Sequence, residues 1–398
     1  MLITEIDAPY LGRSLNNRVG EFIALRRDIH QHPELAFQEH RTSDLVARKL
    51  ESWGYEVARG LGGTGVVGTL RRGDGSRSIG IRADMDALPI QEAGTSDWKS
   101  LTPGQMHACG HDGHTAALLA AARLIAQEAS FSGTLHLIFQ PAEEGAGGAL
   151  RMMEDGLFEQ HPCDAVFALH NMPGIEAGQF VFRAGPSMAS SDNVTIHLHG
   201  TGGHGAMPHE AADTVVAAAS IVMALQTIVA RNIDPLQTAV VTVGALHAGE
   251  ANNVIPEHAR LELSVRALDP QVRIQLRERI CQITELQAQS YRIRAEIDWR
   301  EGYAVLVNSA VETDLAARVA TELFGPARVT LQGPPITASE DFAFMLQRVP
   351  GCYIWVGNGR AGSPGGCSVH TSSYDFNDDI IAPAAAFWTR LVETYLAA

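Results

Sequence analysis

The order of the expected strands and helices is the feature that most limits what this chain can fold into. Short apolar runs at 65–70, 78–83, 133–140 and 165–170, the first three of which begin with or contain glycine, alternate with helical segments such as 114–127. Strands that alternate with helices predict an α/β layer, in which a mixed, largely parallel sheet carries helices on both faces.

The pattern changes near residue 185 and changes back near residue 298. Between them the chain reads as strand, helix, strand, strand, helix and strand, which is typical of a smaller α+β domain of the ferredoxin-like kind. At 398 residues the chain is also long for a single hydrophobic core. We therefore predict one domain split between residues 1–184 and 299–398, with a second domain inserted at 185–298.

Composition narrows the possible partners. Hydrophobic residues make up 45% and charged residues 19%, as in folded globular proteins, and the formal net charge is −15. An acidic chain without a lysine- or arginine-rich block repels phosphate backbones, so nucleic acid is not an expected partner. No stretch approaches the roughly 20 apolar residues that cross a bilayer, so no membrane is expected either.

Cysteine usage and the N-terminus indicate a compartment. The five cysteines are an odd number and widely spaced, unlike a disulfide framework. The first residues lack a basic segment followed by an apolar one, so no secretory signal is expected. Both observations favour the reducing cytoplasm.

One stretch, 105–116 (QMHACGHDGHTA), concentrates groups that are costly to bury. It holds three histidines, a cysteine and an aspartate, and it continues into an alanine- and leucine-rich helix. Four explanations are open on these residues alone: a metal site, a thiol nucleophile with its base, a redox-active cysteine, or a polar loop without chemistry.

Residues of the same kinds follow the expected strands. In an open α/β sheet, ligands collect at the carboxyl ends of the strands, so we expect these side chains to gather at one edge. Mixed sulfur, nitrogen and oxygen donors suit zinc and its first-row neighbours, whereas calcium and magnesium prefer oxygen alone. The side chains concerned are Asp84, Asp86, Cys109, His111, Glu143, Glu144, His170 and His370.

Seven motifs identify a family that the chain resembles. MHACGHD, ADMDALP, QPAEEG, GTGGHGAMPH, ANNVIPE, SEDF and H…YDFND occur in the order typical of the aminoacylase and hippurate hydrolase family of dinuclear metallopeptidases. Relatives in that family include carboxypeptidase G and the plant auxin-conjugate hydrolases. The resemblance covers nearly the whole chain. It implies a catalytic domain with an inserted lid and dimerisation domain, and therefore a homodimer or a dimer of dimers.

The resemblance also implies two divalent metal ions per subunit, and manganese, zinc, cobalt and nickel all remain open. Glu143 resembles the general base that takes a proton from a metal-bridging water, and Asp86 resembles its supporting carboxylate. Other branches place a metal-binding histidine where this chain has Asp84, so Asp84 is left out of the ligand set. The implied ligands are Cys109, which bridges both ions, with His111, Glu144, His170 and His370.

Other polar residues of the 105–116 stretch receive supporting roles. We do not expect His107 or His114 to be metal ligands. Asp112 is a candidate acceptor that fixes a histidine tautomer.

Three residues of the inserted domain are implied to contact the substrate. His204 resembles a residue that reaches the active site of a partner subunit and stabilises the oxyanion there. Asn253 and Arg266 resemble the groups that hold the free carboxylate of the substrate. From the residues alone, Arg266 has a simpler alternative, an ion pair within its own sheet.

The implied reaction is hydrolysis of the amide bond of N-acyl or N-aroyl L-amino acids, such as hippurate. A dipeptidase or carboxypeptidase, or an N-acetyl-diaminopimelate deacetylase, is the alternative within the family. Two alternatives belong to other functional classes. One is a thiol hydrolase with Cys109 as nucleophile, and the other is an inactive protein that only binds acyl amino acids. Glu143 argues against the inactive binder, which needs no general base. The sequence does not fix the acyl group.

Overall fold

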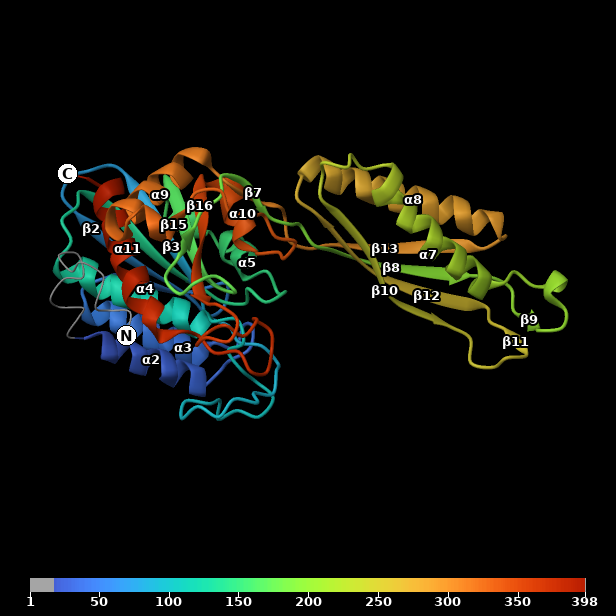
Figure 1. Ribbon diagram of the computed structural model, residues 1–398, viewed down its shortest axis with the longest axis horizontal. Coiled ribbons are helices and arrows are strands. Elements are labelled where there is room, and N and C mark those ends of the chain that lie inside the picture. Colours follow the sequence, from blue (N-terminus) through green and yellow to red (C-terminus); the bar gives the residue numbers. More distant parts are fainter. Residues whose placement is uncertain (1–17, 398) are drawn as a thin grey trace. The chain divides into compact units, whose positions relative to one another are not determined.

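An eight-stranded mixed sheet forms the centre of the first of two units in the computed structural model, which describes residues 18–397 (Figure 1). Unit 1 comprises residues 18–185, 307–334 and 344–397, and unit 2 comprises Pro186–Leu306 and Pro335–Ala343. Unit 1 is therefore assembled from three separate stretches of chain. The short strands β7 (Gly185–Met188) and β14 (Leu306–Asn308) are where the chain passes between the units.

The middle of the large sheet is parallel. β3 runs parallel to both β4 and β5, and β5 runs parallel to β16, whereas β1, β2 and β6 join by antiparallel pairing. β4 and β16 are buried along their whole length, so both faces of the sheet are covered. The predicted mixed, largely parallel sheet is thus confirmed. In spatial order its strands are β1 (Glu56–Leu61), β2 (Gly65–Arg72), β4 (Gly133–Gln140), β3 (Ser78–Asp84), β5 (Ala165–Pro173), β16 (Gly351–Gly359), β6 (Phe180–Val181) and β15 (Val329–Thr330).

The helices of unit 1 cover this sheet. Helix α4 is buried on almost every side, which explains its alanine-rich composition, because small side chains let neighbouring helices and strands approach closely. Helix α2 ends at Gln31 because the residue before Pro33 is sterically excluded from helical geometry. The helices are α2 (Val19–Gln31), α3 (His40–Ser52), α4 (His111–Gln127), α5 (Gly148–Glu154), α6 (Leu157–Gln160), α9 (Ala310–Phe324), η2 (Pro326–Arg328), α10 (Phe342–Arg348), η3 (Asp378–Ile380) and α11 (Ile381–Tyr395).

Unit 2 is an α+β layer with its own core. Four antiparallel strands in the order β10-β12-β8-β13 bury alternate residues, so one sheet face packs on helices and the other carries polar side chains. The order along the chain is the predicted strand, helix, strand, strand, helix, strand. The elements are β8 (Asp192–His199), β9 (Gly203–His204), η1 (Pro208–Glu210), α7 (Thr214–Arg231), β10 (Ala239–Ala248), β11 (Val254–Ile255), β12 (His258–Ala267), α8 (Pro270–Ser290) and β13 (Arg294–Glu301).

Helix α7 combines a buried and an apolar exposed face. By length and composition alone it could cross a membrane, with a mean hydropathy of 1.7, but core helices of soluble proteins meet the same criterion. Ile221, Leu225 and Ile228 point into the core of unit 2. Val216 and Met223 are exposed, so only part of its apolar surface is covered within the chain.

A network of buried charges lies between α2 and the start of α4 in unit 1. Arg26 and His30, one helical turn apart on α2, are fully buried. Arg26 Nε lies 3.1 Å from Asp112 Oδ2, and His30 Nδ1 lies 2.9 Å from the same oxygen. His30 Nε2 also lies 3.5 Å from Glu92 Oε2. Buried charges persist only when paired, and here each has an opposite partner.

The network sets the protonation of His30. Burial by itself lowers the pKa of His30, but the charge and hydrogen bond of Asp112 outweigh burial and raise this pKa to about 9. The folded state therefore favours the protonated imidazole more than the unfolded chain does, because the ordinary pKa is 6.5. The resulting stabilisation is complete below that ordinary pKa and is lost as pH rises through about 9.

We predict that His30→Gln destabilises the protein more at neutral pH than at alkaline pH. The variant cannot carry the proton whose binding stabilises the wild type, so the gap between their urea midpoints should shrink from about pH 6.5 to about pH 9.5. His32→Gln, at a half-exposed histidine on the same stretch, is the matched control. An equal penalty for His30→Gln at both pH values would contradict the prediction.

Candidate metal centre

Four segments of unit 1 that are distant in sequence meet at the carboxyl ends of the parallel strands. They are the loop before α4, the turn after β4, the end of β5 and the loop that follows β16. Each contributes donor atoms of the types predicted from the sequence. The arrangement is a direct consequence of parallel pairing, which places successive strand ends at one edge.

Cys109 belongs to two groups of donor atoms at once. Within each group the donor atoms lie no more than 4.8 Å apart: Cys109, His111 and His170 form one, and Cys109, Glu144 and His370 form the other. The Cys109 Sγ lies 3.3 Å from His170 Nε2, and Glu144 Oε1 lies 3.1 Å from His370 Nε2. All five predicted ligands are therefore brought together, with the sulfur shared between the two groups.

Hydrogen bonds turn the histidines toward the centre. His111 Nδ1 lies 3.1 Å from Asp86 Oδ1, and His170 Nδ1 donates to the carbonyl of Asn171 at 2.6 Å. Both imidazoles thus hold a proton on Nδ1 and present Nε2 as a donor of electrons, the arrangement of metal-binding histidines. His111 Nε2 is buried and has no hydrogen-bond partner among residues 18–397.

Asp86 connects two of the candidate ligands. Besides binding His111, it accepts the backbone N–H of Glu144 at 2.9 Å through Oδ2. The carboxylate is almost fully buried, so both bonds are protected from water. Asp86 therefore contacts one residue from each donor group, which is the geometry expected of a supporting carboxylate.

Two loops at the centre adopt backbone geometry that ordinary residues avoid. Ala142, just before Glu143, has a φ of 55°, and His370 has a φ of 60°. The buried Glu39 accepts the N–H of Ala142 at 2.9 Å, and the N–H of His370 donates to the carbonyl of Ala108 at 2.7 Å. Such conformations cost about 1–3 kcal/mol each and persist only where the surroundings impose them, which is common at functional sites.

The centre is rich in negative charge. Asp84, Asp86 and Glu143 are buried, and Glu144 lies beside them. Burial first, and then the charges of Glu144 and Glu143, raise the pKa of the Cys109 thiol well above its usual range. Burial lowers the pKa of His111, but Asp84 and Asp86 outweigh it and raise that pKa to about 10. A cluster of carboxylates with a thiol and unpaired imidazole nitrogen fits divalent cations.

Asp84 and His114 support the centre without joining it. Asp84, His111 and His114 are close enough to hold an ion, but His114 has both ring nitrogens engaged. Its Nδ1 donates to Asp84 Oδ1 at 2.6 Å and its Nε2 accepts the backbone N–H of Asn171 at 3.0 Å. Arg82 pairs with the other Asp84 oxygen at 2.6 Å. Leaving Asp84 and His114 out of the ligand set agrees with this geometry.

Several residues around the centre were not found from the sequence. Asp112 does fix a histidine, but the histidine is His30, which carried no role in the sequence analysis. The spacing of these residues in the sequence was a signal for burial, because Arg26 and His30 fall on the same buried face of α2 as Phe22 and Ile29. Asn171 and Tyr374 were also missed: each is next to or near a ligand and gave no signal of its own. His107 is buried and makes no hydrogen bond through its ring within the described chain.

The three predicted substrate contacts lie in unit 2. His204 and Asn253 are neighbours, because β9 pairs with β11 and the N–H of Gly205 donates to the Asn253 carbonyl at 2.8 Å. Arg266, on β12, donates to the carbonyl of Thr337 at 2.9 Å. No carboxylate within residues 18–397 forms an ion pair with Arg266, so the alternative of an intrasheet pair is wrong.

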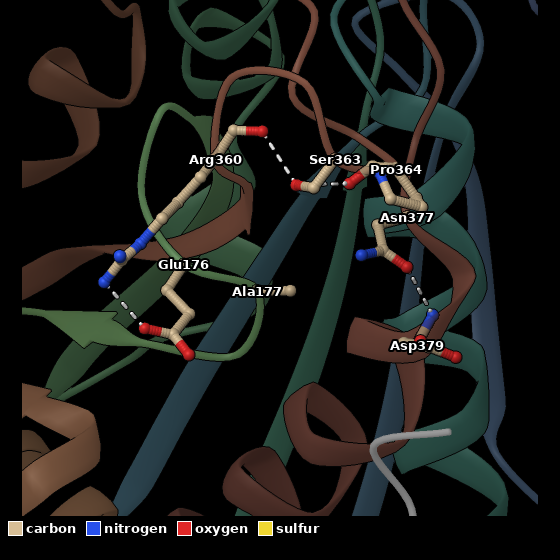
Figure 2. Close-up of a pocket in the computed structure, with 7 residues that line it drawn as sticks. All are labelled: Glu176, Ala177, Arg360, Ser363, Pro364, Asn377 and Asp379. Carbon is tan, nitrogen blue, oxygen red and sulfur yellow. Dashed lines mark hydrogen bonds and ion pairs between the residues drawn. The ribbon is translucent and has the colours of Figure 1, made fainter.

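A cavity of about 320 Å³ lies elsewhere in unit 1 (Figure 2). Arg360 pairs with Glu176 at 2.9 Å, and Asn377 accepts the N–H of Asp379 at 3.0 Å, so these polar groups satisfy one another. Ser363 donates to the Arg360 carbonyl at 2.7 Å. The predicted site residues do not line this cavity, and its chemistry offers no reacting group.

Comparison with known proteins places this geometry in a family. The sequence model that describes Peptidase family M20/M25/M40 matches residues 80–394 of this chain. The chain is 45% identical to the hippurate hydrolase of Campylobacter jejuni, over 95% of this chain and 97% of that one. It is 36% identical to the N-acetyl-L-cysteine deacetylase of Bacillus subtilis, over 92% and 86% of the two chains.

A solved structure gives the same result. The crystal structure of a dinuclear metal binding peptidase from the M20 family of Bacillus subtilis matches with a TM-score of 0.83 at 32% identity. The match covers 96% of this chain and 99% of that chain. The chain belongs to Peptidase family M20/M25/M40.

Proposed function

We propose that the protein is a two-metal amidohydrolase that cleaves the amide bond of N-acyl or N-aroyl L-amino acids, releasing a carboxylic acid and a free amino acid. The observation that carries the proposal is the sharing of the Cys109 sulfur by two groups of metal-binding side chains. The 45% identity with a hippurate hydrolase over nearly the whole chain supports the choice of substrate class.

The two groups assign the ligands. One ion would be held by Cys109, His111 and His170, and the other by Cys109, Glu144 and His370. Sulfur and nitrogen donors favour zinc, manganese, cobalt or nickel over calcium and magnesium. When bound, two such ions lower the pKa of a water and polarise the amide carbonyl.

Glu143 is the proposed general base. It is almost fully buried, next to Glu144, and its carboxylate lies within 4.8 Å of the donor atoms of His111 and Glu144. From there it takes a proton from the attacking water and passes the proton to the departing amide nitrogen. The same carboxylate thus serves both halves of the reaction, as base and then as acid.

His204 is suited to donate a hydrogen bond to the oxyanion. Its Nδ1 accepts the backbone N–H of Ala206 at 3.0 Å, which places the proton of the neutral ring on Nε2. His204 is also exposed, so a group outside unit 2 can reach its ring. We assign it to the active site of a partner subunit, with Asn253 and Arg266 holding the free carboxylate of the substrate.

The environment of Cys109 disfavours the thiol hydrolase. A nucleophilic cysteine needs a lowered pKa, supplied by nearby positive charge. Here burial and the carboxylates raise the pKa of Cys109, so the thiolate forms only when cations are bound to it. Cys109 therefore serves as a metal ligand and not as a nucleophile.

We predict that Glu143→Gln lowers kcat by about 10²- to 10⁴-fold while two metal ions remain bound. The amide keeps the size of the carboxylate but cannot take the proton, and Glu143 is not in the ligand set. Turnover assays together with elemental analysis of the purified variant check both parts. Glu154→Gln, at an exposed position on α5, is the control. Unchanged turnover in Glu143→Gln would remove the mechanism.

We expect a strong chelator to abolish activity and manganese, cobalt or zinc to restore it, because the proposed reaction needs the ions to lower the pKa of the attacking water. The substrate panel is hippurate, N-acetyl-methionine, N-acetyl-diaminopimelate and a dipeptide, with the highest kcat/KM expected for hippurate. A preference for the dipeptide or for N-acetyl-diaminopimelate would select those alternatives. Activity that resists the chelator but is lost to iodoacetamide would select the thiol hydrolase.

We propose that unit 2 forms a homodimer through the exposed face of α7, either alone or within a dimer of dimers. Val215, Val216, Met223 and Val229 expose apolar surface along this helix, and β10 is an edge strand of the sheet beside it. Apolar patches of this kind mark protein interfaces.

We predict that Met223→Glu halves the mass measured by light scattering, which for a dimer alone is a change from twice to once the 42.7 kDa of the chain. A charge in the centre of an apolar interface cannot be solvated, so association weakens. Leu236→Glu introduces the same charge at an exposed loop position and should leave the mass unchanged. A monomeric wild type would contradict the proposal.

The cytoplasm is the proposed compartment. All five cysteines are free, two of them buried. Free thiols persist in reducing surroundings, and Cys109 must remain reduced to serve as a ligand.

A further inference from the structure

We propose that Asn171 is a positioning residue that fixes the geometry of the two-metal centre by joining three ligand-bearing segments through one fully buried amide. This inference rests on the two-metal site proposed above. It assigns the residue after His170 a role separate from metal binding and from proton transfer.

The side chain of Asn171 joins two of these segments. Its Nδ2 donates to the carbonyl of Cys109 at 2.6 Å, which holds the loop that carries the shared sulfur. Its Oδ1 accepts the hydroxyl of Tyr374 at 2.8 Å, four residues beyond His370. An amide is suited to this task because it offers a donor and an acceptor on one rigid plane.

The backbone of Asn171 fixes the third segment. Its carbonyl accepts Nδ1–H of His170, which sets the tautomer and orientation of that ligand. Its N–H donates to His114 Nε2, and His114 in turn is held by Asp84. Asn171 therefore contacts the end of β5, the loop before α4 and the loop after β16 at the same time.

The packing around Asn171 requires a glycine at position 110. A Cβ there would lie 2.3 Å from Asn171 Nδ2 and 2.4 Å from the Tyr374 hydroxyl, too close for any side chain. Gly110 also has a φ of 97°, in the left-handed region. The glycine in the CGH motif is thus explained by the space that the Asn171 amide occupies between Cys109 and Tyr374.

Loss of the Asn171 amide should weaken metal binding more than it lowers the stability of the fold. Without Nδ2 the Cys109 carbonyl keeps no donor from Asn171, so the sulfur is free to move relative to His170. Removing a residue that orients a ligand typically weakens metal binding by about 10- to 100-fold. Asn308 provides a matched comparison, because it is almost equally buried in unit 1 and its amide makes three hydrogen bonds with the backbone of Arg183 and Tyr353. Neither of these two residues is in the proposed ligand set.

The experiment compares Asn171→Leu, Tyr374→Phe and Asn308→Leu with the wild type. Leucine keeps the approximate volume of asparagine without its polar groups, and phenylalanine removes only the hydroxyl that binds Oδ1. Cobalt(II) affinity is measured by competition with a chromophoric chelator, and the sulfur-to-cobalt charge-transfer band reports whether Cys109 is bound. Unfolding of the metal-free proteins by urea measures the stability of the fold separately.

The expected result is cobalt affinity about 10- to 100-fold weaker in Asn171→Leu, with a weakened charge-transfer band, and a smaller change of the same kind in Tyr374→Phe. Asn308→Leu should lower the urea midpoint and leave the affinity and the band unchanged. If Asn171→Leu does not fold, the cobalt affinity and the charge-transfer band of Tyr374→Phe test the inference.

Two outcomes overturn the inference while the proposed function stands. One is wild-type cobalt affinity and band in Asn171→Leu and Tyr374→Phe, and the other is an equal loss of affinity in Asn308→Leu. A wild type that binds no cobalt would instead overturn the two-metal site itself. The two failures are therefore distinguishable in one set of measurements.

Discussion

The concentration of negative charge and soft donors around the Cys109 sulfur is the constraint on which the rest of unit 1 depends. Carboxylates from two strand ends, a buried thiol and three imidazoles are costly to hold together without cations. The surrounding structure is therefore built to resist their separation. Asp86 binds one residue from each donor group, Asn171 spans three segments, and Arg26 joins Asp112 to the segment that follows His370.

The same constraint explains the unusual backbone at the centre. Ala142 and His370 lie in the left-handed region, and Gly110 does as well, so the chain turns sharply in three of the four segments that meet at the centre. Parallel strands bring the loops to one edge, but only these turns aim the side chains at a common point. Two of the turns are held by hydrogen bonds, in which Glu39 accepts the N–H of Ala142 and the Ala108 carbonyl accepts the N–H of His370.

Much of this could be predicted because it depends on short-range pattern. Short apolar runs gave the strands of the parallel sheet, and the change of periodicity gave the α+β unit around α7 and α8. The chemistry of the ligands was also visible, because cysteine, histidine and glutamate at strand ends are rare as structural residues. Asn171 and Tyr374 gave no such signal, and the position of Arg26 and His30 on the buried face of α2 indicated burial but no chemistry. Each acts by contacting a residue far away in sequence, such as Asp112 or Cys109.

The sequence by itself determined the fold class and the family, and through the family resemblance it predicted the five side chains that could hold metal ions. These features can be recognised because periodicity and motifs depend on residues that are close together in the sequence. Only the tertiary structure supplied the contacts: the donor atoms that lie near the shared Cys109 sulfur, the bonds of His114 to Asp84 and Asn171, and the pairing of Asp112 with His30. These contacts depend on which atoms come within hydrogen-bonding distance once β3, β4, β5 and β16 align. The spacing of residues along the sequence does not indicate which atoms those are.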